Sequence, residues 1–430
     1  MAFTPKGSKS GSGQTGAPSG QQAGRGSGAP RRPRTVSNAA WLAQAQMGDK
    51  GPLNNLVNAH LGLSLDPAFV GLLAFDQMLY APVLVRPLAG GNGSAADYPR
   101  VVTDADVDQL QETLQTLGLR HVGQRTVWQA VGIVAREHCI HPLRDWLDAL
   151  VWDGTLRIAD WLRRGLGADD SEYHKSIGTM FLISMIARIY RPGCKADYML
   201  VLEGPQGILK SQACAVLAGP EHFSDSLPDL GSDHVRVSMH LRGKWIVEVS
   251  ELHAFHRAEA SRLKQFLSSQ VEQYVPKFGR AEVREPRQCV LIGTTNKDTY
   301  LQDDTGGRRF WPVKCGTIDL IWMRDNREQL LAEAIKCYRD DVHWWPERDF
   351  ELKHITPVQA ERYESDAWDK SVMDYLTGQI QTTLMEVAVN ALGFRKDQFR
   401  RSEQLRIAAI MRQAGWHSRR GTSGTHYWER

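Results

Sequence analysis

The stretch that most constrains the fold is an apolar run followed at once by a glycine-containing loop, "DYMLVLEGPQGILKS". An apolar run of this length between turn residues is typical of a buried strand. Strand, glycine loop and helix in this order are the context of a phosphate-binding loop, or P-loop. In such a loop backbone N–H groups surround the phosphates, while a lysine and a hydroxyl group reach the outer phosphates and Mg²⁺.

The loop departs from the usual pattern G-x-x-x-x-G-K-[ST] at one position, where Leu209 replaces the second glycine. Because Gly207 supplies backbone freedom inside the loop, we expect the cradle to persist if Leu209 adopts ordinary helical dihedral angles. We therefore predict a nucleotide site, with ATP and Mg²⁺ as ligands. Its predicted residues are Gly204, Pro205, Gln206, Gly207, Ile208, Leu209, Lys210 and Ser211.

Two later strands carry polar residues where a nucleotidase needs them. "GKWIVEVSEL" has Glu248 within an apolar strand and Glu251 at its end, suited to holding Mg²⁺ or polarising the attacking water. A half-buried strand with solvent-facing acids would explain one glutamate equally well. "CVLIGTTNKD" ends in a polar tip that includes Asn296 and can orient water against the γ-phosphate.

A pair of arginines, Arg308 and Arg309, follows two glycines in "DDTGGRRFWPV". Paired arginines usually belong to a solvated face, but a rigidly placed guanidinium suits an arginine finger. The loop, the acidic strand, the asparagine and the arginines together predict ATP hydrolysis more firmly than any one of them.

These motifs, together with "HPLRDWLDALVWDGTLRIADWL" and "FSDSLPDLGS", resemble the virulence-associated E family of phage and mobile-element proteins. That family is related to superfamily 3 helicases and to the helicase half of poxvirus-type primase-helicases. The resemblance runs from about residue 125 to about residue 315. It implies an α/β P-loop ATPase core, with a parallel sheet and flanking helices, that assembles into a hexameric ring.

The resemblance also implies roles for the residues named above. Lys210 and Ser211 would bind nucleotide and Mg²⁺, and Glu248 and Glu251 would form the acidic strand, with Glu251 as a further Mg²⁺ ligand. Asn296 would be the sensor of the γ-phosphate. Arg308 or Arg309 would reach the nucleotide of a neighbouring subunit.

The segment "QYVPKFGRAEVREPRQ" occupies the interval in which superfamily 3 helicases carry a hairpin that projects into the ring channel. Single strands need cations for phosphate and aromatic rings for base stacking. We therefore predict contact with single-stranded DNA, and an ordinary hairpin with a basic tip is the alternative. The predicted contact residues are Tyr274, Lys277, Phe278 and Arg280.

Composition and periodicity divide the chain into five parts. Residues 1–37 are rich in Gly, Ser and Pro and are expected to be disordered. We predict a mainly helical domain over 38–195, the ATPase domain over 196–330, a helical connector over 331–367 and a winged-helix-like domain over 368–430.

Charge points to an anionic polymer as partner. The first 48 residues hold six basic and no acidic side chains, and residues 391–430 hold nine basic against three acidic ones, in a chain whose net charge is only +3. Duplex DNA bound by the C-terminal domain is the favoured interpretation. A winged helix used for protein contact is the alternative.

Other features exclude several classes of protein. Apolar runs of 18 residues and a signal-peptide pattern are missing, so we expect a cytoplasmic protein without membrane contact. The six cysteines contain no C-x-x-C pair, which argues against disulfides and zinc. Asp104, Asp106 and Asp108 are open to a metal-binding interpretation, but Thr103 and acids in a first helical turn favour a helix start.

The sequence thus predicts an ATP-dependent DNA helicase or translocase of a phage, prophage or genomic island, acting on single- and double-stranded DNA. The alternative is a non-translocating, nucleotide-gated DNA-binding initiator or regulator with weak hydrolysis. Primase activity lacks support because no catalytic carboxylate cluster stands out in the N-terminal half. A separate primase or initiator is a further candidate partner.

Overall fold

The structure is a computed structural model. It describes residues 40–430 except for 90–93, 232, 253–256, 278, 302–306, 364–366 and 421–425. The segment 1–37, predicted to be disordered, lies outside the described residues. The chain divides into two compact units, Met1–Val70 with Thr103–Val131, and Gly71–Val102 with Gly132–Arg430.

The described part of the first unit is mostly helical. It contains a 3₁₀ helix (Ala40–Gln44), a short hairpin of β1 (Met47–Gly48) and β2 (Gly51–Pro52), helices α1 (Leu56–Leu65) and α2 (Asp104–Leu117), and the start of α3 (Gln124–Glu137). Thr103 is the N-cap of α2, and it forms a reciprocal capping box with Asp106. Asp104 accepts a hydrogen bond from Trp128 Nε1 at 3.2 Å. The aspartates therefore start a helix, as the capping pattern predicted.

The second unit begins with a four-stranded sheet in the order β5-β4-β3-β6. Its strands are β3 (Leu73–Asp76), β4 (Ala81–Leu84), β5 (Arg100–Val101) and β6 (Cys139–Ile140). The carboxylate of Asp76 accepts hydrogen bonds from Met78 N at 2.7 Å and Leu79 N at 3.0 Å, which turns the chain between β3 and β4. The part predicted as a mainly helical domain thus also contains a sheet, because this local turn pairs two apolar segments as strands.

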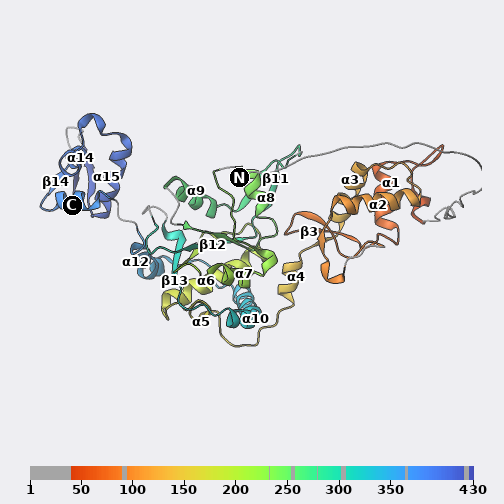
Figure 1. Ribbon diagram of the computed structural model, residues 1–430, viewed down its shortest axis with the longest axis horizontal. Coiled ribbons are helices and arrows are strands. Elements are labelled where there is room, and N and C mark those ends of the chain that lie inside the picture. The colour runs from red at the N-terminus through yellow and green to blue at the C-terminus, as the bar shows by residue number, and fades with distance from the viewer. Residues whose placement is uncertain are drawn as a thin grey trace, which may run out of the picture. The chain divides into compact units, whose positions relative to one another are not determined.

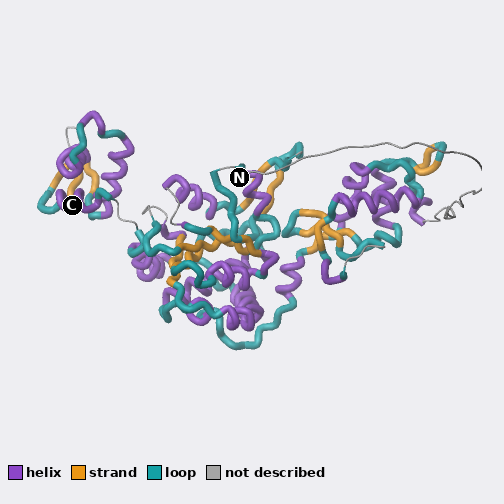
Figure 2. Tube along the Cα trace, viewed as in Figure 1, coloured by secondary structure: helices purple, strands orange, loops and turns teal. Residues whose placement is uncertain are grey.

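The core of the second unit is a parallel five-stranded sheet in the order β13-β7-β12-β9-β8 (Figures 1 and 2). Strand β7 (Met199–Glu203) pairs with β12 (Val290–Thr295) on one side and β13 (Phe310–Lys314) on the other. Strand β9 (Ile246–Val249) joins β12 to the short β8 (Phe223–Ser224). This is the parallel α/β arrangement predicted for the P-loop core.

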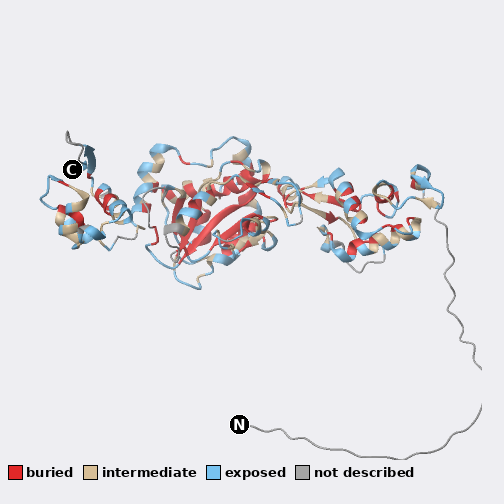
Figure 3. Cartoon of the chain, turned by 90° about the horizontal axis from the view of Figure 1, so that it is seen from above, coloured by how far each residue is buried: buried red, intermediate tan, exposed pale blue. Residues whose placement is uncertain are grey.

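Alternate residues of these strands face two separate apolar layers, and Figure 3 shows the strands of the core as buried. Leu200, Leu202 and Ile292 pack with helices on one face, and Met199 and Val201 pack on the other. The first layer contains residues of α5 (Trp161–Leu166), α6 (Glu172–Tyr190), α7 (Lys210–Ala218) and α10 (Leu320–Arg339). The second contains residues of α9 (Arg257–Leu267).

Helices α4 (Pro142–Asp148), α5 and α6 fall inside the segment predicted as an N-terminal domain, yet they contribute to the first layer. Phe181, Ile186 and several other side chains of α6 are completely buried there. The predicted boundary at 195 therefore cuts through one hydrophobic core, because the apolar side chains of α6 pack in the same layer as those of α7 and α10.

Beyond β13, helix α10 is followed by short helical turns, namely α11 (Arg348–Phe350), a π-helical turn (Glu351–Ile355) and α12 (Thr356–Ala360). The C-terminal part has its own core, which includes Val372, Ile407 and Trp428. Its elements are α13 (Asp369–Leu376), β14 (Gln381–Thr382), α14 (Leu384–Leu392), α15 (Arg401–Gln413), β15 (His417–Arg420) and β16 (His426–Glu429). The three strands pair in the order β14-β16-β15.

Among the described residues no helix is both long and apolar enough to cross a membrane. All six cysteines carry free thiols, and four of them are buried. A search of the described residues finds no cluster of three or more His, Cys, Asp or Glu side chains able to hold a metal ion.

Candidate nucleotide site

The P-loop connects the carboxyl end of β7 to the first turn of α7. Gly204 and Gly207 both have positive φ, at 145° and 87°. Leu209 is the N-cap of α7, with φ 75° and ψ 22°, so it lies in the left-handed region. The expectation of ordinary helical dihedral angles at Leu209 was wrong. The turn requires a glycine-type conformation there, and a leucine adopts it at a steric cost.

Lys210 is folded back over this loop. Its Nζ donates to the carbonyl oxygens of Gly204 at 2.6 Å and Pro205 at 2.9 Å. Partial burial lowers the pKa of this ammonium group. The positive charge therefore sits at the loop itself, where P-loop proteins place it against phosphate.

One carboxylate oxygen of Glu248, on β9, accepts from two hydroxyl groups on other elements, Ser211 of α7 and Thr294 of β12. Glu248 Oε1 accepts hydrogen bonds from Ser211 Oγ at 2.9 Å and from Thr294 Oγ1 at 2.6 Å. Glu248 is only 2% exposed, and among the described residues its Oε2 has no hydrogen-bond partner. A buried carboxylate oxygen without a donor or cation is costly, so this position is suited to a ligand that supplies positive charge.

Glu251 and Asn296 lie beyond the ends of β9 and β12. Glu251 is exposed and has a positive φ of 54°. Asn296 is also exposed, directly after β12. The observed contact to Ser211 thus comes from Glu248, and the Mg²⁺ role predicted for Glu251 stays a prediction. Because β9 and β12 are parallel neighbours, both side chains belong to the same edge of the sheet as the P-loop.

Arg308 and Arg309 lie at the opposite end of the sheet, where the parallel strands begin. They precede Phe310, which pairs with Met199 at the start of β7, whereas the P-loop follows the end of that strand. Five residues of β-strand span about 16 Å. Arg309 Nε donates to Ser268 Oγ at 3.0 Å, while Arg308 is exposed. Neither arginine is therefore placed next to the P-loop of its own chain.

A buried hydrogen-bond network next to the P-loop was not predicted from the sequence. Glu203, the last residue of β7, accepts two hydrogen bonds from the Arg362 guanidinium at 3.0 and 3.1 Å and one from Tyr300 Oη at 2.9 Å. Tyr300 N and Leu301 N both donate to Arg362 O at 3.0 Å. The network joins the residue before Gly204, the segment after Asn296 and the connector. Separations of up to 159 residues left no local signal for it.

The predicted DNA-contacting segment is a hairpin of β10 (Val271–Tyr274) and β11 (Val283–Pro286). Tyr274 is only 5% exposed, its Oη contacts both carboxylate oxygens of Glu285 at 3.2 Å, and burial raises its pKa to about 12. It cannot stack on a base without unfolding the strand, so its assignment as a DNA contact was wrong. Lys277 and Arg280 are exposed at the tip, and Phe278 lies outside the described residues.

Two ion pairs fix the root of this hairpin. Arg287 is 4% exposed and donates from Nε and Nη2 to one carboxylate oxygen of Glu272, whose other oxygen accepts from Ser238 Oγ at 2.8 Å. The Arg287 guanidinium lies 4.1 Å from the centroid of the Phe266 ring. Arg242 donates from Nε and Nη2 to the two carboxylate oxygens of Glu285, one bond to each. The hairpin therefore starts from a rigid, charge-paired base.

Comparisons with known proteins give one family and several distant folds. A search of curated proteins finds no significant match. Similar solved structures include two apo structures of the NrS-1 C-terminal region. Both are 14% identical, with TM-scores of 0.39 (covering 83% of this chain and 95% of that chain) and 0.38 (66% and 77%). A Thermotoga maritima RuvB mutant is 15% identical, with a TM-score of 0.23, covering 58% of this chain and 90% of that chain.

At these TM-scores residues cannot be equated between the chains. The family match is of a different kind, because it rests on sequence and covers the P-loop, the acidic strand, the hairpin and the connector. The model of the virulence-associated protein E-like domain matches residues 147–364, which is more than half of the chain. The chain therefore belongs to the family of proteins that carry a virulence-associated protein E-like domain.

Proposed function

We propose that this protein hydrolyses ATP at the Gly204–Ser211 loop and uses the energy to move along DNA. The observation that carries the proposal is the buried contact of Ser211 with Glu248, whose second carboxylate oxygen has no partner among the described residues. Its position on the strand next but one to β7 is where P-loop proteins hold the carboxylate that acts with Mg²⁺.

These residues fit a magnesium ion. Hydroxyl and carboxylate oxygens are ligands that Mg²⁺ prefers, and Ser211 and Glu248 offer one of each within hydrogen-bond distance. A bound Mg²⁺ would neutralise charge on the outer phosphates. Lys210 would bind the same phosphates in place of the two loop carbonyls it now contacts. We expect Asn296 and Glu251, both exposed at the carboxyl end of the sheet, to orient the attacking water.

Hydrolysis between subunits of a ring, with a hexamer as the proposed form, is supported by the arginine pair. Because Arg308 and Arg309 are at the sheet edge opposite the P-loop, either could act only on the nucleotide of another chain. Arg309 is hydrogen-bonded to Ser268 of its own chain, so Arg308 is the better candidate for the finger.

Two elements support DNA as the substrate. The hairpin presents exposed Lys277 and Arg280 on a rigid base, which suits contact with single-strand phosphates. In the C-terminal part, one strand, two helices and a hairpin follow the first helix, and the sheet order β14-β16-β15 is that of a winged helix. Its net positive charge supports duplex contact. A replication protein of a phage, prophage or genomic island, in the cytoplasm and working with a separate primase or initiator, is consistent with these features.

One observation favours the second candidate, a nucleotide-gated DNA-binding protein that does not translocate. Leu209 holds a left-handed conformation at the entrance of α7, which strains the loop that must close on nucleotide. If that strain slows turnover, the protein would bind ATP and DNA while hydrolysing little.

The test is ATP turnover with and without single-stranded DNA, in the wild type and in Lys210→Ala. We expect DNA to stimulate turnover severalfold. Lys210→Ala should abolish turnover with the fold retained, because the Lys210 ammonium group contacts loop carbonyls and the residue is not part of the hydrophobic core. Lys277→Ala should keep basal turnover and lose the stimulation. Turnover in Lys210→Ala equal to the wild type would contradict ATP hydrolysis at this loop, and ATP binding without DNA stimulation would favour the second candidate.

Arg308→Ala and Arg309→Ala form a matched pair for the ring. We expect Arg308→Ala to lose hydrolysis while retaining ATP binding, and Arg309→Ala to lose less. Mixing Lys210→Ala with Arg308→Ala chains should restore part of the activity, since one interface then combines an intact loop with an intact finger. A rate per chain that ignores dilution would argue against hydrolysis between subunits.

A further inference from the structure

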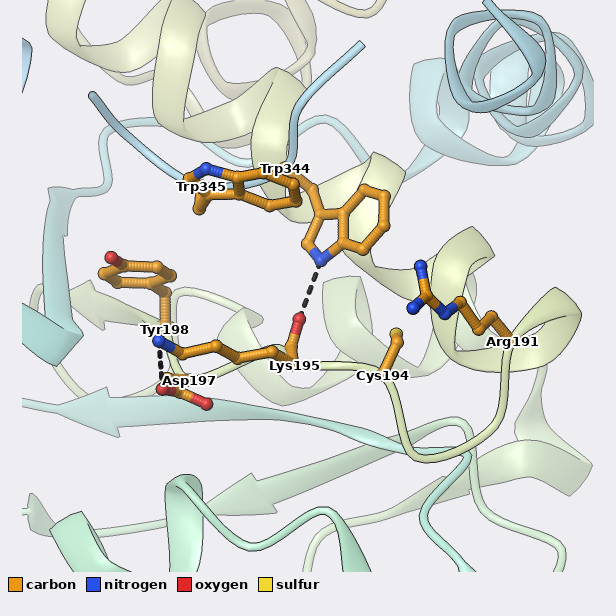
Figure 4. Close-up of a pocket in the computed structure, with 7 residues that line it drawn as sticks. All are labelled: Arg191, Cys194, Lys195, Asp197, Tyr198, Trp344 and Trp345. Atoms are coloured by element: carbon orange, nitrogen blue, oxygen red, sulfur yellow. Dashed lines mark hydrogen bonds and ion pairs between the residues drawn. The ribbon is translucent and has the colours of Figure 1, made fainter. Parts of the chain in front are cut away.

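A hollow of about 300 Å³ lies at the amino end of β7, the sheet edge opposite the P-loop. The segment from Arg191 to Tyr198 forms one side, and Trp344 and Trp345 cover the other (Figure 4). Pockets for small organic ligands have volumes from about 300 Å³ upward. The hollow is thus large enough for one flat ring system with a polar group attached.

The aromatic side chains of this hollow are held in place. Trp344 Nε1 donates to Lys195 O at 2.7 Å, as the dashed line in Figure 4 shows. Trp345 meets Trp344 edge to face, with ring centroids 5.0 Å apart, and stacks on His343 at 4.5 Å. Tyr198 stacks on the buried Trp311 at 4.6 Å. Trp345 is nevertheless 42% exposed, so part of its ring is open to a ligand.

The polar groups around these rings leave one acceptor unused. Asp197 forms an ion pair through Oδ2 with Lys195 at 3.5 Å, but its buried Oδ1 has no hydrogen-bond partner among the described residues. Because Asp197 lines the hollow, its carboxylate is the group there that can accept a hydrogen bond from an N–H group of a ligand. Nucleobases combine such a group with a flat face for stacking.

Charge decides between an anionic and a cationic ligand. An aromatic pocket with one acid would suit an ammonium group, but here Arg191 and Lys195 outnumber Asp197. Arg188, only 1% exposed, adds a further cation close enough to act electrostatically on Cys194 and Asp197. Among the described residues its Nε has no hydrogen-bond partner. This balance favours a ligand that carries negative charge beside the ring.

We propose that this hollow is a second nucleotide site, which stacks one nucleobase on Trp345 and Tyr198, satisfies Asp197 with a base N–H, and holds a phosphate with Arg191 and Lys195. The base and its phosphate can come from a free mononucleotide or from an unpaired nucleotide within a strand. The site is separate from the P-loop and does not depend on ATP hydrolysis there.

Isothermal titration calorimetry with 2′-deoxyadenosine 5′-monophosphate and with single-stranded oligo(dA) tests the proposal. The proteins are the wild type, Lys210→Ala, Trp345→Ala, Trp345→Phe and Lys195→Ala, with Trp152→Ala as the control for loss of a half-buried tryptophan outside the hollow. We expect at least one probe to bind with a Kd that Lys210→Ala and Trp152→Ala leave unchanged. Trp345→Ala should weaken that binding about tenfold or more, and Trp345→Phe should largely preserve it.

Lys195→Ala, at a side chain 71% exposed, removes the phosphate contact with little risk to the fold and should also weaken binding. Dependence on Trp345 for the mononucleotide identifies a free nucleotide as the ligand, and dependence for oligo(dA) alone identifies a nucleotide within a strand. Equal binding of 2-deoxyribose 5-phosphate would overturn the stacking role. Binding that Trp345→Ala leaves unchanged for both probes, or no binding of either probe, would overturn the site. These binding measurements do not depend on ATP turnover. A failure of the second nucleotide site can therefore be distinguished from a failure of the proposed ATPase activity.

Discussion

At the root of the β10–β11 hairpin each buried carboxylate meets an arginine, whereas at the P-loop the buried carboxylate of Glu248 meets only hydroxyl groups. Glu272 is paired with Arg287 and Glu285 with Arg242. Glu248 keeps one oxygen without a partner among the described residues, and two nearby residues, Leu209 and Glu251, have positive φ. Full pairing stabilises a shape, while an unsatisfied acceptor and strained backbone mark a place completed by a ligand.

The largest effect should come from breaking the hairpin root. Glu272→Ala leaves Arg287 buried without its counter-ion, and we expect the free energy of unfolding in urea to fall by about 3–5 kcal/mol. Lys175→Ala breaks the exposed ion pair with Asp170 and should leave the free energy of unfolding almost unchanged. Equal losses in the two variants would show that the Glu272 pair does not anchor the hairpin.

The P-loop should respond in activity and not in stability. Glu248→Gln removes the negative charge but keeps the acceptor for Ser211 and Thr294, so we expect ATP turnover to fall about a hundredfold or more with little change in unfolding. Thr294→Val, which removes one neutral hydrogen bond to the same oxygen, is the matched control and should cost far less. If Glu248→Gln kept its turnover while Glu251→Gln lost it, Glu251 would be the metal ligand, as the resemblance implied.

A substitution at Leu209 should have a smaller effect of opposite sign, a gain in the free energy of unfolding. A left-handed conformation costs a residue with a Cβ about 1–2 kcal/mol, and glycine avoids that cost. Leu209→Gly should therefore raise the free energy of unfolding by up to about 1 kcal/mol, part of the gain being offset by the freedom of glycine in the unfolded chain. Leu209→Ala keeps the strain and serves as control. Loss of nucleotide binding in Leu209→Gly would mean that the leucine side chain itself supports the loop.

Site residues were predictable from the sequence where the residues that form the feature are close together in the chain. The strand, the loop and Lys210 are consecutive, so pattern and chemistry located them together. Glu248 was located because it interrupts an apolar strand, whereas the role of Asn296 beyond the end of β12 stays a prediction. The dihedral angles of Leu209 could not be predicted, since its replacement of a glycine is compatible with either conformation until the turn is built.

Tyr274 shows the opposite limit. An aromatic residue near a basic tip is compatible with base stacking, but alternation along β10 places Tyr274 on the same face as the buried Glu272. The partners that bury it, Arg242 and Glu285, come from other elements. The Arg362–Glu203 pair was missed for the same reason, because burial of a charge is decided by residues distant in the chain.

The smallest predicted effect concerns His141, whose buried contact with Gln288 lies just beyond β11 of the hairpin. His141 is 1% exposed, its Nδ1 accepts from Arg144 N at 3.1 Å, and its Nε2 lies 2.7 Å from Gln288 Oε1. An accepting Nδ1 requires the neutral ring, with the proton on Nε2 donated to Gln288. Burial lowers the pKa of His141 below its usual 6.5, with nearby Arg144 lowering it further and the Gln288 contact and Asp76 opposing the shift.

Because the unfolded chain binds this proton more readily, the contribution of His141 to stability is fully present above about pH 6.5. It is lost as the pH falls from that value towards the lowered pKa. Asn at this position can cap α4 and donate to Gln288 without titrating, so the urea midpoint of His141→Asn should fall less than that of the wild type between pH 7 and pH 5. Parallel curves for the two proteins would show that His141 binds its proton as readily in the folded protein as in the unfolded chain. The buried contacts of His141 would then not favour the neutral ring.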